Sequence, residues 1–424
     1  MDRLRLIAGG RGAALLAAAG VAGVVVALSL RPAGARAAAG QDWSPFVLVA
    51  GLLLIGLVAD ADGLFRYAGH QLGRVARSGP LVFAGATVII AAVTVTLNLD
   101  TSVAFLTPVL VYTARSRGGD RADAGPALLY GCLLLSNAGS LLLPGSNLTN
   151  LIVLGHLRLT GGQFAARMWL PWLGALIVTA VVVGIGERRS LRGAQTAGAG
   201  DGPADDAADD AADDAANDAA GGAADHPVVT GGSGAGAEPA RGGGGVGLAA
   251  VLLATAGVIA LPAPALPVLA LGVAAAGLRL AQRRVTTGQV WDVLSLPVLV
   301  GLFGVAVALG TLGRAWSGPA AALGHLDGWA TAGVAALATV VLNNLPAASL
   351  LAARAVSHPF SLLVGLNLGP NLCVTGSLAW LLWLRAARGA GARPSLRRAS
   401  VLGLVAVPLS MAVALGALAL TGTA

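Results

Sequence analysis

Long apolar runs separated by short gaps that carry arginine dominate the hydrophobic and polar pattern of this chain. A helix needs about 20 predominantly apolar residues to cross a bilayer. Runs of that order, some of them shorter at the edges, predict membrane-spanning helices at residues 13–30, 43–66, 126–157, 168–186, 246–261, 263–279, 292–313, 360–384 and 399–421. The pattern therefore predicts an all-α polytopic membrane protein.

Two further apolar runs, at residues 80–114 and 329–356, are interrupted near their centres by polar residues. The first is divided by Asn98-Leu99-Asp100-Thr101-Ser102 and the second by Asn343-Asn344-Leu345-Pro346. Polar groups and irregular backbone are tolerated at membrane depth only where protein buries them or where they line a cavity. We therefore predict two re-entrant hairpins, each of which enters and leaves the membrane on one side.

Two of the predicted spans contain helix breakers next to amide side chains. The first holds Pro144-Gly145-Ser146-Asn147-Leu148-Thr149-Asn150, and the second holds Asn367-Leu368-Gly369-Pro370-Asn371. Proline removes a helical hydrogen bond, so backbone groups are left open at such a position. The sequence therefore predicts one broken helix in each half of the chain.

The order of span, hairpin, broken helix and span runs from residue 43 to 186 and again from 292 to 421. Short loops rich in arginine face the cytoplasm. With the N-terminus inside, twenty arginines lie in predicted cytoplasmic segments and six lie outside. The first hairpin then opens to the cytoplasm and the second to the outside, which predicts an inverted repeat with tips and breaks near the midplane.

Ten of the twenty acidic residues fall between Asp201 and Glu238, in a tract of glycine, alanine and aspartate that lacks the apolar surface needed to fold. A solvated spacer is the preferred interpretation, and a docking segment is the alternative. The arginines before the first apolar run also fit a cleaved signal peptide, but the length of the run favours a retained helix. The expected organisation is a first membrane helix and loop at 1–42, repeat 1 at 43–192, a disordered acidic cytoplasmic linker at 193–245, connecting membrane helices at 246–291 and repeat 2 at 292–424.

Composition excludes several classes of protein. With 56% hydrophobic and 11% charged residues, the 424-residue chain is too apolar for a soluble globule. All 27 basic residues are arginine, which removes Schiff-base and Walker-type lysine chemistry. The sequence shows no Ser-His-Asp arrangement and no His/Cys cluster with metal-ligand spacing. We therefore expect no enzyme, no cofactor and no metal site, and we attribute the basic excess to anionic lipid rather than to nucleic acid.

Asp100 is the acidic residue that lies deep in a predicted re-entrant segment. Ionising a carboxylate is costly at membrane depth, which suits a group that takes up and releases a proton during a transport cycle. The alternative is a structural N-cap for the second arm of the hairpin. Asp60 and Asp62 lie at helical spacing from Arg66 and His70, which predicts ion pairing at the surface.

The remaining candidates are amides and hydroxyls at the hairpin tips and helix breaks. Such groups both donate and accept hydrogen bonds, which suits a neutral polyhydroxyl solute or a weakly held ion. The alternative is hydrogen bonding between helices, which is common for these residues in membranes. The predicted substrate-binding residues are Asn98, Thr101, Ser102, Asn147, Thr149, Asn150, Asn343, Asn344, Asn367 and Asn371.

Four stretches resemble the arsenical pump membrane protein family, the arsenite/antimonite efflux permeases of the ion transporter superfamily. They are Leu53 to Phe65, Asp100 to Pro108, Ser146 to Ile152, and the group of Asn343 to Pro346, Leu368 to Pro370 and Gly376 to Leu384. The resemblance covers nearly the whole chain apart from the linker. This sequence has Leu99 where the family usually has Asn, and Asn371 where it usually has Lys.

The resemblance implies a secondary transporter in the cytoplasmic membrane that exports arsenite or antimonite hydroxide by proton antiport, assisted in some members by a soluble ATPase. Asp100 would then carry the proton. Related branches of the superfamily transport dicarboxylates or inorganic anions with sodium, or exchange sodium for protons, and these alternatives stay open. A membrane scaffold that recruits a partner through the acidic linker is a further alternative, and a homodimer is among the assemblies that the sequence allows. The N-terminus and the central linker are expected in the cytoplasm.

Overall fold

The computed structural model describes residues 10–76, 78–118, 125–157, 159–192 and 245–422, and every regular element in these ranges is a helix. Within them, six helical segments are long and apolar enough to cross a membrane. These segments are Gly12–Leu30, Pro32–Ala61, Gly79–Thr96, Gly161–Gly186, Thr287–Ala315 and Leu396–Leu420. The predicted fold class, an all-α polytopic membrane protein, is confirmed. The expected linker at 193–245 lies almost entirely outside the described residues.

The first half of the chain begins with a helix that precedes the repeat and continues through a hairpin and a broken helix. Its elements are α2 (Gly10–Leu30), α3 (Pro32–Ala61), α4 (Leu64–Val75), α5 (Gly79–Thr96), α6 (Leu99–Gly118), α7 (Gly125–Gly139), η2 (Pro144–Ser146), α8 (Leu148–Leu154), α9 (Gly161–Gly186) and α10 (Arg188–Arg192). The predicted span at 43–66 is divided, because Gly63 adopts a φ of 79° and turns the chain from α3 into α4. Helix α4 buries Phe65 and Leu72 and exposes Arg66, as expected for a helix at a membrane surface.

The second half repeats this order of elements. It contains α12 (Gly245–Ala260), α13 (Ala265–Ala281), α14 (Thr287–Leu294), α15 (Leu296–Ala315), α16 (Gly318–Gly324), α17 (Gly328–Leu342), α18 (Asn344–Leu351), α19 (Pro359–Leu368), η3 (Gly369–Leu372), α20 (Ala379–Gly389) and α21 (Leu396–Leu420). Helices α15 to α21 correspond in order to α3 to α9. Each set comprises a long helix, a short helix, a hairpin, a broken helix and a final span.

The two hairpins have sharp tips. Between α5 and α6, Asn98 Oδ1 accepts a hydrogen bond from Thr101 N at 2.7 Å and caps the second arm. Between α17 and α18, Asn343 adopts a φ of 81°, a conformation that costs energy in a residue with a side chain. Both polar tips that the sequence indicated are therefore turns between helices.

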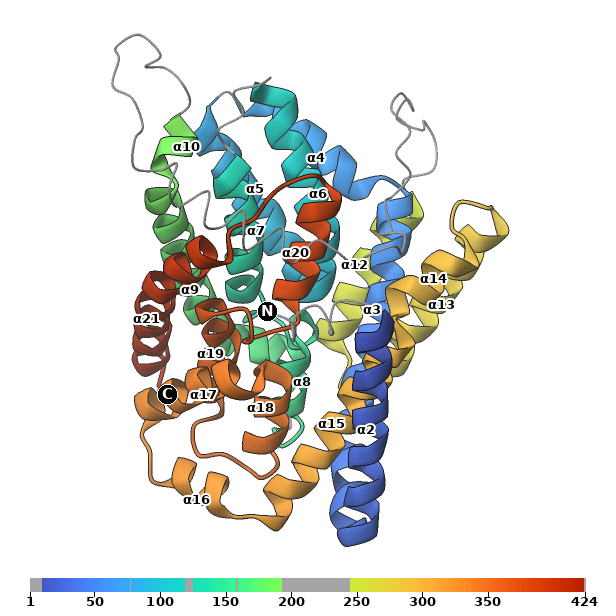
Figure 1. The fold of residues 1–424 in the computed structure, drawn as a ribbon, viewed down its shortest axis with the longest axis vertical. Coiled ribbons are helices and arrows are strands. Elements are labelled where there is room, and N and C mark those ends of the chain that lie inside the picture. Colours follow the sequence, from blue (N-terminus) through green and yellow to red (C-terminus); the bar gives the residue numbers. More distant parts are fainter. Residues whose placement is uncertain (1–9, 77, 119–124, 158, 193–244, 423–424) are drawn as a thin grey trace.

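The two repeats run in opposite directions through the molecule (Figure 1). Helices α4 and α10 lie at one end, here called the α4 end, and α16 lies at the opposite end, here called the α16 end. Since α4 leads into the first hairpin and α16 into the second, the hairpins open at opposite ends. This is the inverted arrangement predicted from the sequence.

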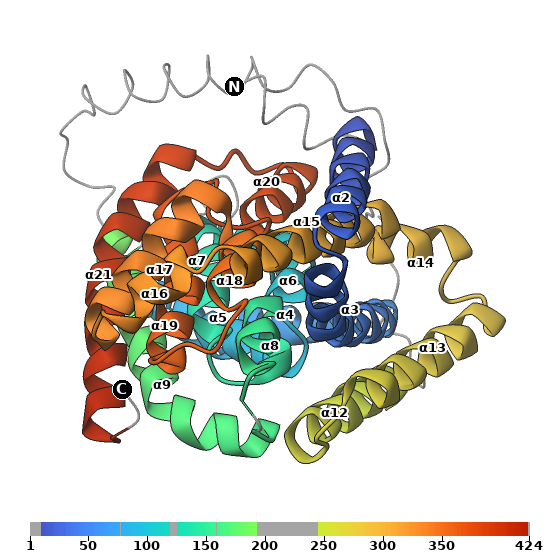
Figure 2. The same ribbon diagram turned by 90° about the horizontal axis from the view of Figure 1, so that it is seen from below.

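Each helix that precedes a repeat packs against the first long helix of the other repeat. Helix α2 packs on α15, and α13 packs on α3 (Figure 2). Both contacts depend on glycine: a Cβ on Gly20 would lie 2.3 Å from Gly301 O, and one on Gly272 would lie 2.6 Å from Gly51 O. Such small residues let backbones approach closely, which drives helix association in membranes.

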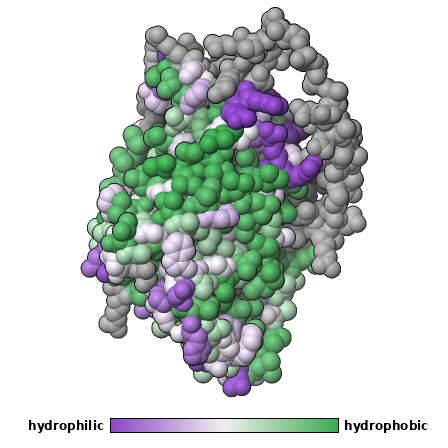
Figure 3. All heavy atoms as spheres, turned by 90° about the vertical axis from the view of Figure 1, so that its left-hand side faces the viewer, coloured by the Kyte–Doolittle hydropathy of each residue, from purple (hydrophilic) through white to green (hydrophobic). Residues whose placement is uncertain are grey.

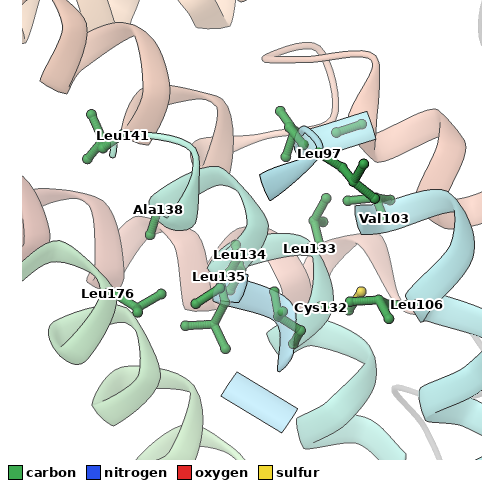
Figure 4. Packing of buried hydrophobic residues seen from close by; sticks show 14 of the residues in the cluster. Leu97, Val103, Leu106, Cys132, Leu133, Leu134, Leu135, Ala138, Leu141 and Leu176 are labelled. Atoms are coloured by element: carbon green, nitrogen blue, oxygen red, sulfur yellow. The ribbon is translucent and has the colours of Figure 1, made fainter. Parts of the chain in front are cut away.

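The core packs hairpin side chains against the first broken helix, and the surface is apolar across its middle. Leu97, Val103 and Leu106 of the first hairpin lie around Leu133 and Leu134 of α7 (Figure 4). On the face shown in Figure 3, hydrophobic side chains cover the middle and hydrophilic ones gather toward the ends. A surface of this kind fits the acyl chains and headgroups of a bilayer.

Candidate functional site

A cluster of buried amides and hydroxyls joins the first broken helix to the second. At its centre, Asn367 of α19 accepts hydrogen bonds through Oδ1 from Ser140 Oγ at 2.7 Å and from Asn147 Nδ2 at 2.8 Å. Its Nδ2 donates to Asn150 Oδ1 at 2.8 Å. All four side chains are buried. The structure thus brings together Asn147, Asn150 and Asn367, three of the predicted site residues, from opposite halves of the chain.

A second link connects the same two broken helices at η3, four residues after Asn367. Asn371 Oδ1 accepts from Asn137 Nδ2 at 2.8 Å, and Asn371 Nδ2 donates to Leu134 O at 3.0 Å. The hydroxyls of Ser102 and Ser136 lie 3.0 Å apart and tie the first hairpin to α7. Sequence reasoning did not single out Asn137, Ser136 or Ser140, although three polar residues in the middle of the apolar run at 126–157 were the signal for them.

The amides also close the open backbone at the first helix break. Asn150 Nδ2 donates to Ser140 O at 2.7 Å and to Leu143 O at 3.1 Å, which satisfies carbonyls left free after α7 ends at Gly139. Asn147 is the N-cap of α8, and its Oδ1 accepts from Thr149 N at 3.2 Å. Hydrogen bonding between helices, the alternative to substrate binding, is therefore present. The two roles are compatible at these positions.

The second hairpin tip meets the loop that follows η3. Asn343 Nδ2 donates to Thr375 O at 3.1 Å, and Asn344 N donates to Gly376 O at 2.9 Å. Asn344 Oδ1 accepts from the neighbouring Leu345 N at 2.9 Å. These two predicted residues therefore bond to the second break rather than to Asn367.

Asp100 lies in the first turn of α6 and is half-buried. The suggestion that Asp100 is the N-cap is wrong, because α6 begins at Leu99 and Asn98 provides the capping oxygen for Thr101 N. Asn98 caps α6 because its side-chain oxygen accepts a hydrogen bond from the backbone N–H of Thr101, three residues further along the chain.

Several predicted site residues carry buried polar atoms that lack a hydrogen-bond partner among the described residues: Asn98 Nδ2, Thr101 Oγ1 and Thr149 Oγ1. The first hairpin tip lies beside the first break, because Ser146 Oγ donates to Val95 O at 3.2 Å. Orphaned buried polar groups are uncommon in proteins and indicate a missing partner such as water, an ion or a solute. These atoms are therefore available to a ligand.

Asp62 does not pair with Arg66 or His70 as expected. Its carboxylate lies 2.6 and 2.7 Å from Arg279 Nη2 of α13, and its Oδ2 accepts from Gly247 N at 2.7 Å. The side chains of Arg279 and Asp62 are 4% and 0% exposed. Helical spacing identifies only neighbours on one helix, so it missed a partner 217 residues away. Asp60, in contrast, lies close enough to Arg66 for the two opposite charges to attract each other.

One solved structure and one family model are similar to this chain. The structure of the Alcanivorax borkumensis YdaH transporter is 16% identical, with 98% of this chain and 89% of that chain covered and a TM-score of 0.44. The CitMHS family model, described as citrate transporter, matches residues 6–384. This match supports a membrane transporter. It does not show the specificity for arsenite that was expected from the four stretches. The chain therefore belongs to the CitMHS citrate transporter family, and it is a multi-pass membrane transporter.

Proposed function

We propose that this chain is a secondary active transporter that carries a polycarboxylate of the citrate class, together with the cations that neutralise it, through the amide cluster. One observation carries the proposal: buried amides from both halves meet at Asn367, beside a hairpin tip whose Asn98 Nδ2 and Thr101 Oγ1 lack partners among the described residues. A binding site between two inverted repeats is where a transporter of this architecture exposes its solute to either side.

The chemistry of the site sets the conditions for an anionic solute. Amide N–H groups, hydroxyls and the N-terminus of α6 supply donors for carboxylate oxygens. The side chains bonded in the cluster carry no formal charge, however, so they do not offset a multiply charged anion. Moving unbalanced charge into a low-dielectric interior is expensive. The solute therefore enters with protons or metal cations, and Asp100 is the proposed group that holds one of them.

Export of arsenite or antimonite hydroxide by proton antiport is the second candidate. The observation in its favour is the same absence of formal charge in the cluster, since a neutral trihydroxide needs hydrogen-bonding groups rather than countercharge. Asp100 would then carry the antiported proton. In this scheme the N-terminus and linker face the cytoplasm, where a soluble ATPase can dock.

The test is flux into proteoliposomes that contain the purified full chain. Labelled citrate and arsenite are offered in turn, each under an imposed proton gradient and an imposed sodium gradient. We expect concentrative citrate uptake under one of the gradients. We also expect that Asp100→Asn abolishes gradient-driven uptake while citrate counterflow persists, since exchange needs the site but not net cation movement. Ser361→Ala is the matched control and should leave flux unchanged, since it removes a buried hydroxyl of α19 that has no partner in the described part of the chain.

Each negative outcome is informative. Absence of citrate flux under every gradient refutes the polycarboxylate proposal, and arsenite flux in the same vesicles establishes the second candidate. Equal loss of uptake and counterflow in Asp100→Asn would contradict the role of Asp100 in coupling and assign it to binding or folding.

A further inference from the structure

A small cavity lies at the α16 end, between the last turn of α8, the end of α18 and the start of α19. It encloses about 40 Å³, and its lining includes Val153, His156 and Leu157 on one side and Arg354, Ala355 and Pro359 on the other. A volume of about 10–15 Å³ on this measure holds one water, so the cavity has room for about three waters. That is the size of a single carboxylate group.

The cavity is adjacent to the amide cluster along α8. Val153 lies three residues after Asn150 on the same helix, which places it on the same face and about 4.5 Å further along the axis. Asn150 itself bonds to Asn367 at the centre of the cluster. The cavity wall and the proposed transport site are therefore about one helical turn apart on α8.

Two arginines lie at or beside this cavity, and Arg354 is part of its wall. Arg354 donates a hydrogen bond to Arg314 O, so these two arginines are neighbours in space. Arg314 in turn donates to Gly310 O at 2.9 Å and to Gln41 Oε1. The imidazole of His156 is held at the cavity by a 2.9 Å hydrogen bond between Nε2 and Ala352 O. None of the residues that line the cavity is acidic.

One acidic side chain lies near this group of residues. The buried Asp42 interacts electrostatically with Arg314 and offsets part of its charge. Arg354 has no such acidic neighbour among the residues that line the cavity with it. The cavity therefore keeps a net positive character.

Two further nitrogen atoms, one on His358 and one on Arg167, are buried without a partner in the described part of the chain. They are Arg167 Nη1 and His358 Nδ1. The guanidinium carbon of Arg167 is 5.9 Å from the ring centroid of Phe360, and His358 and Phe360 flank Pro359, a residue of the cavity wall. The guanidinium N–H of Arg167 is a donor, and a buried donor without a partner is costly, so an anionic acceptor that reaches it would remove that cost.

We infer that this cavity is a vestibule that binds one carboxylate group of an anionic solute before it reaches the amide cluster. Arg354 in the cavity wall provides the positive charge, which raises the local concentration of the anion, and Arg167, which lies over the ring of Phe360 next to Pro359, is the second cation on this side. The second function of the vestibule is specificity, because a neutral hydroxide gains nothing from it. The identity of the solute rests on the proposed function, whereas the affinity of the vestibule for anions does not.

Charge-selective thiol modification tests the vestibule without any transport. The full chain in detergent carries Ala355→Cys together with Cys373→Ser, while the fully buried Cys132 stays in place. Modification rates are compared for a methanethiosulfonate reagent that bears a sulfonate and one that bears a trimethylammonium group. We expect the anionic reagent to react about tenfold faster relative to the cationic one, in line with electrostatic steering into a charged cleft.

A matched cysteine gives the reference for this ratio. Ala322→Cys on α16 is exposed at the same end of the molecule but is not part of the cavity wall. The ratio at position 355 should exceed the ratio at position 322 and should fall toward it when Arg354→Gln or Arg167→Gln is added. Equal ratios at the two positions would overturn the inference, even if citrate transport is observed.

Occupancy is measured by protection of the same cysteine. Citrate or sulfate at constant ionic strength should slow modification at position 355, and Arg167→Gln should weaken this protection severalfold. Protection by neither anion overturns the inference, and so does protection by an anionic lipid in mixed micelles but not by citrate or sulfate. If proteoliposomes show no citrate flux while sulfate protects, the proposed function fails and the vestibule stands.

Discussion

Replacing Asn367 with leucine should loosen the junction between the two halves of the protein. Leucine is close to asparagine in size and has high helix propensity, so the change mainly removes the amide group. The lost bonds join Asn367 to Ser140, Asn147 and Asn150, which all belong to the other repeat. Leucine forms no hydrogen bond in their place, so Ser140, Asn147 and Asn150 each lose one buried partner.

The three hydrogen bonds set the size of the effect. Hydrogen bonds between membrane helices are worth about 0.6 kcal/mol each on average, which gives about 2 kcal/mol for three. Burying an unsatisfied polar group costs about 1–3 kcal/mol, so three groups that found no replacement partner would cost about 3–9 kcal/mol. We expect a loss of about 2–5 kcal/mol in the free energy of unfolding.

Equilibrium unfolding of the purified chain in mixed detergent micelles measures this loss. The control is Ser361→Ala on the same helix: the serine is also fully buried, but its hydroxyl bonds to none of the described residues, so its removal should be neutral or slightly stabilising. Wild-type stability for Asn367→Leu would refute the reasoning. A loss of equal size in Ser361→Ala would show that general packing of α19, rather than the amide, is responsible.

Two other changes test how the repeats are held by the helices that precede them. Gly272→Ala should destabilise the protein and lower its melting temperature, because the new Cβ would lie 2.6 Å from Gly51 O, whereas Gly277→Ala on the same helix meets nothing within 4 Å and should be neutral. Arg279→Gln leaves the buried carboxylate of Asp62 without its cation and should cost about 3–5 kcal/mol in denaturant unfolding. Adding Asp62→Asn should recover part of that loss, and a double variant less stable than Arg279→Gln would contradict a buried ion pair.

The hydrophobic pattern was sufficient to predict the order of helices, hairpins and helix breaks, because each of these is determined by residues close together in the sequence. Apolar runs set the spans, Asn98 and Asn343 mark the two tips, and Pro144 and Pro370 mark the two breaks. The ends of the helices were less predictable from the sequence. The span expected at 43–66 divides into α3 and α4 at Gly63, because a hydropathy pattern contains no information about a left-handed backbone turn.

The candidate site was predictable in its chemistry but not in its pairing. Asn147, Asn150 and Asn367 could be named because polar residues next to helix breakers are rare in apolar runs. Their bonds to one another, and the participation of Asn137, depend on how the two repeats pack, and sequence separation gives no information about that. The pairing of Asp62 with Arg279 escaped prediction for the same reason.

The exchange of preceding helices between the repeats has a consequence for assembly. Helix α2 is part of the N-terminal half of the sequence but packs on α15 of the C-terminal half. Helix α13 is part of the C-terminal half but packs on α3 of the N-terminal half. A half expressed alone would expose to lipid the glycine surfaces that normally meet its counterpart. Two co-expressed fragments divided within 193–244 should therefore complement each other and associate in the membrane, whereas neither should persist by itself.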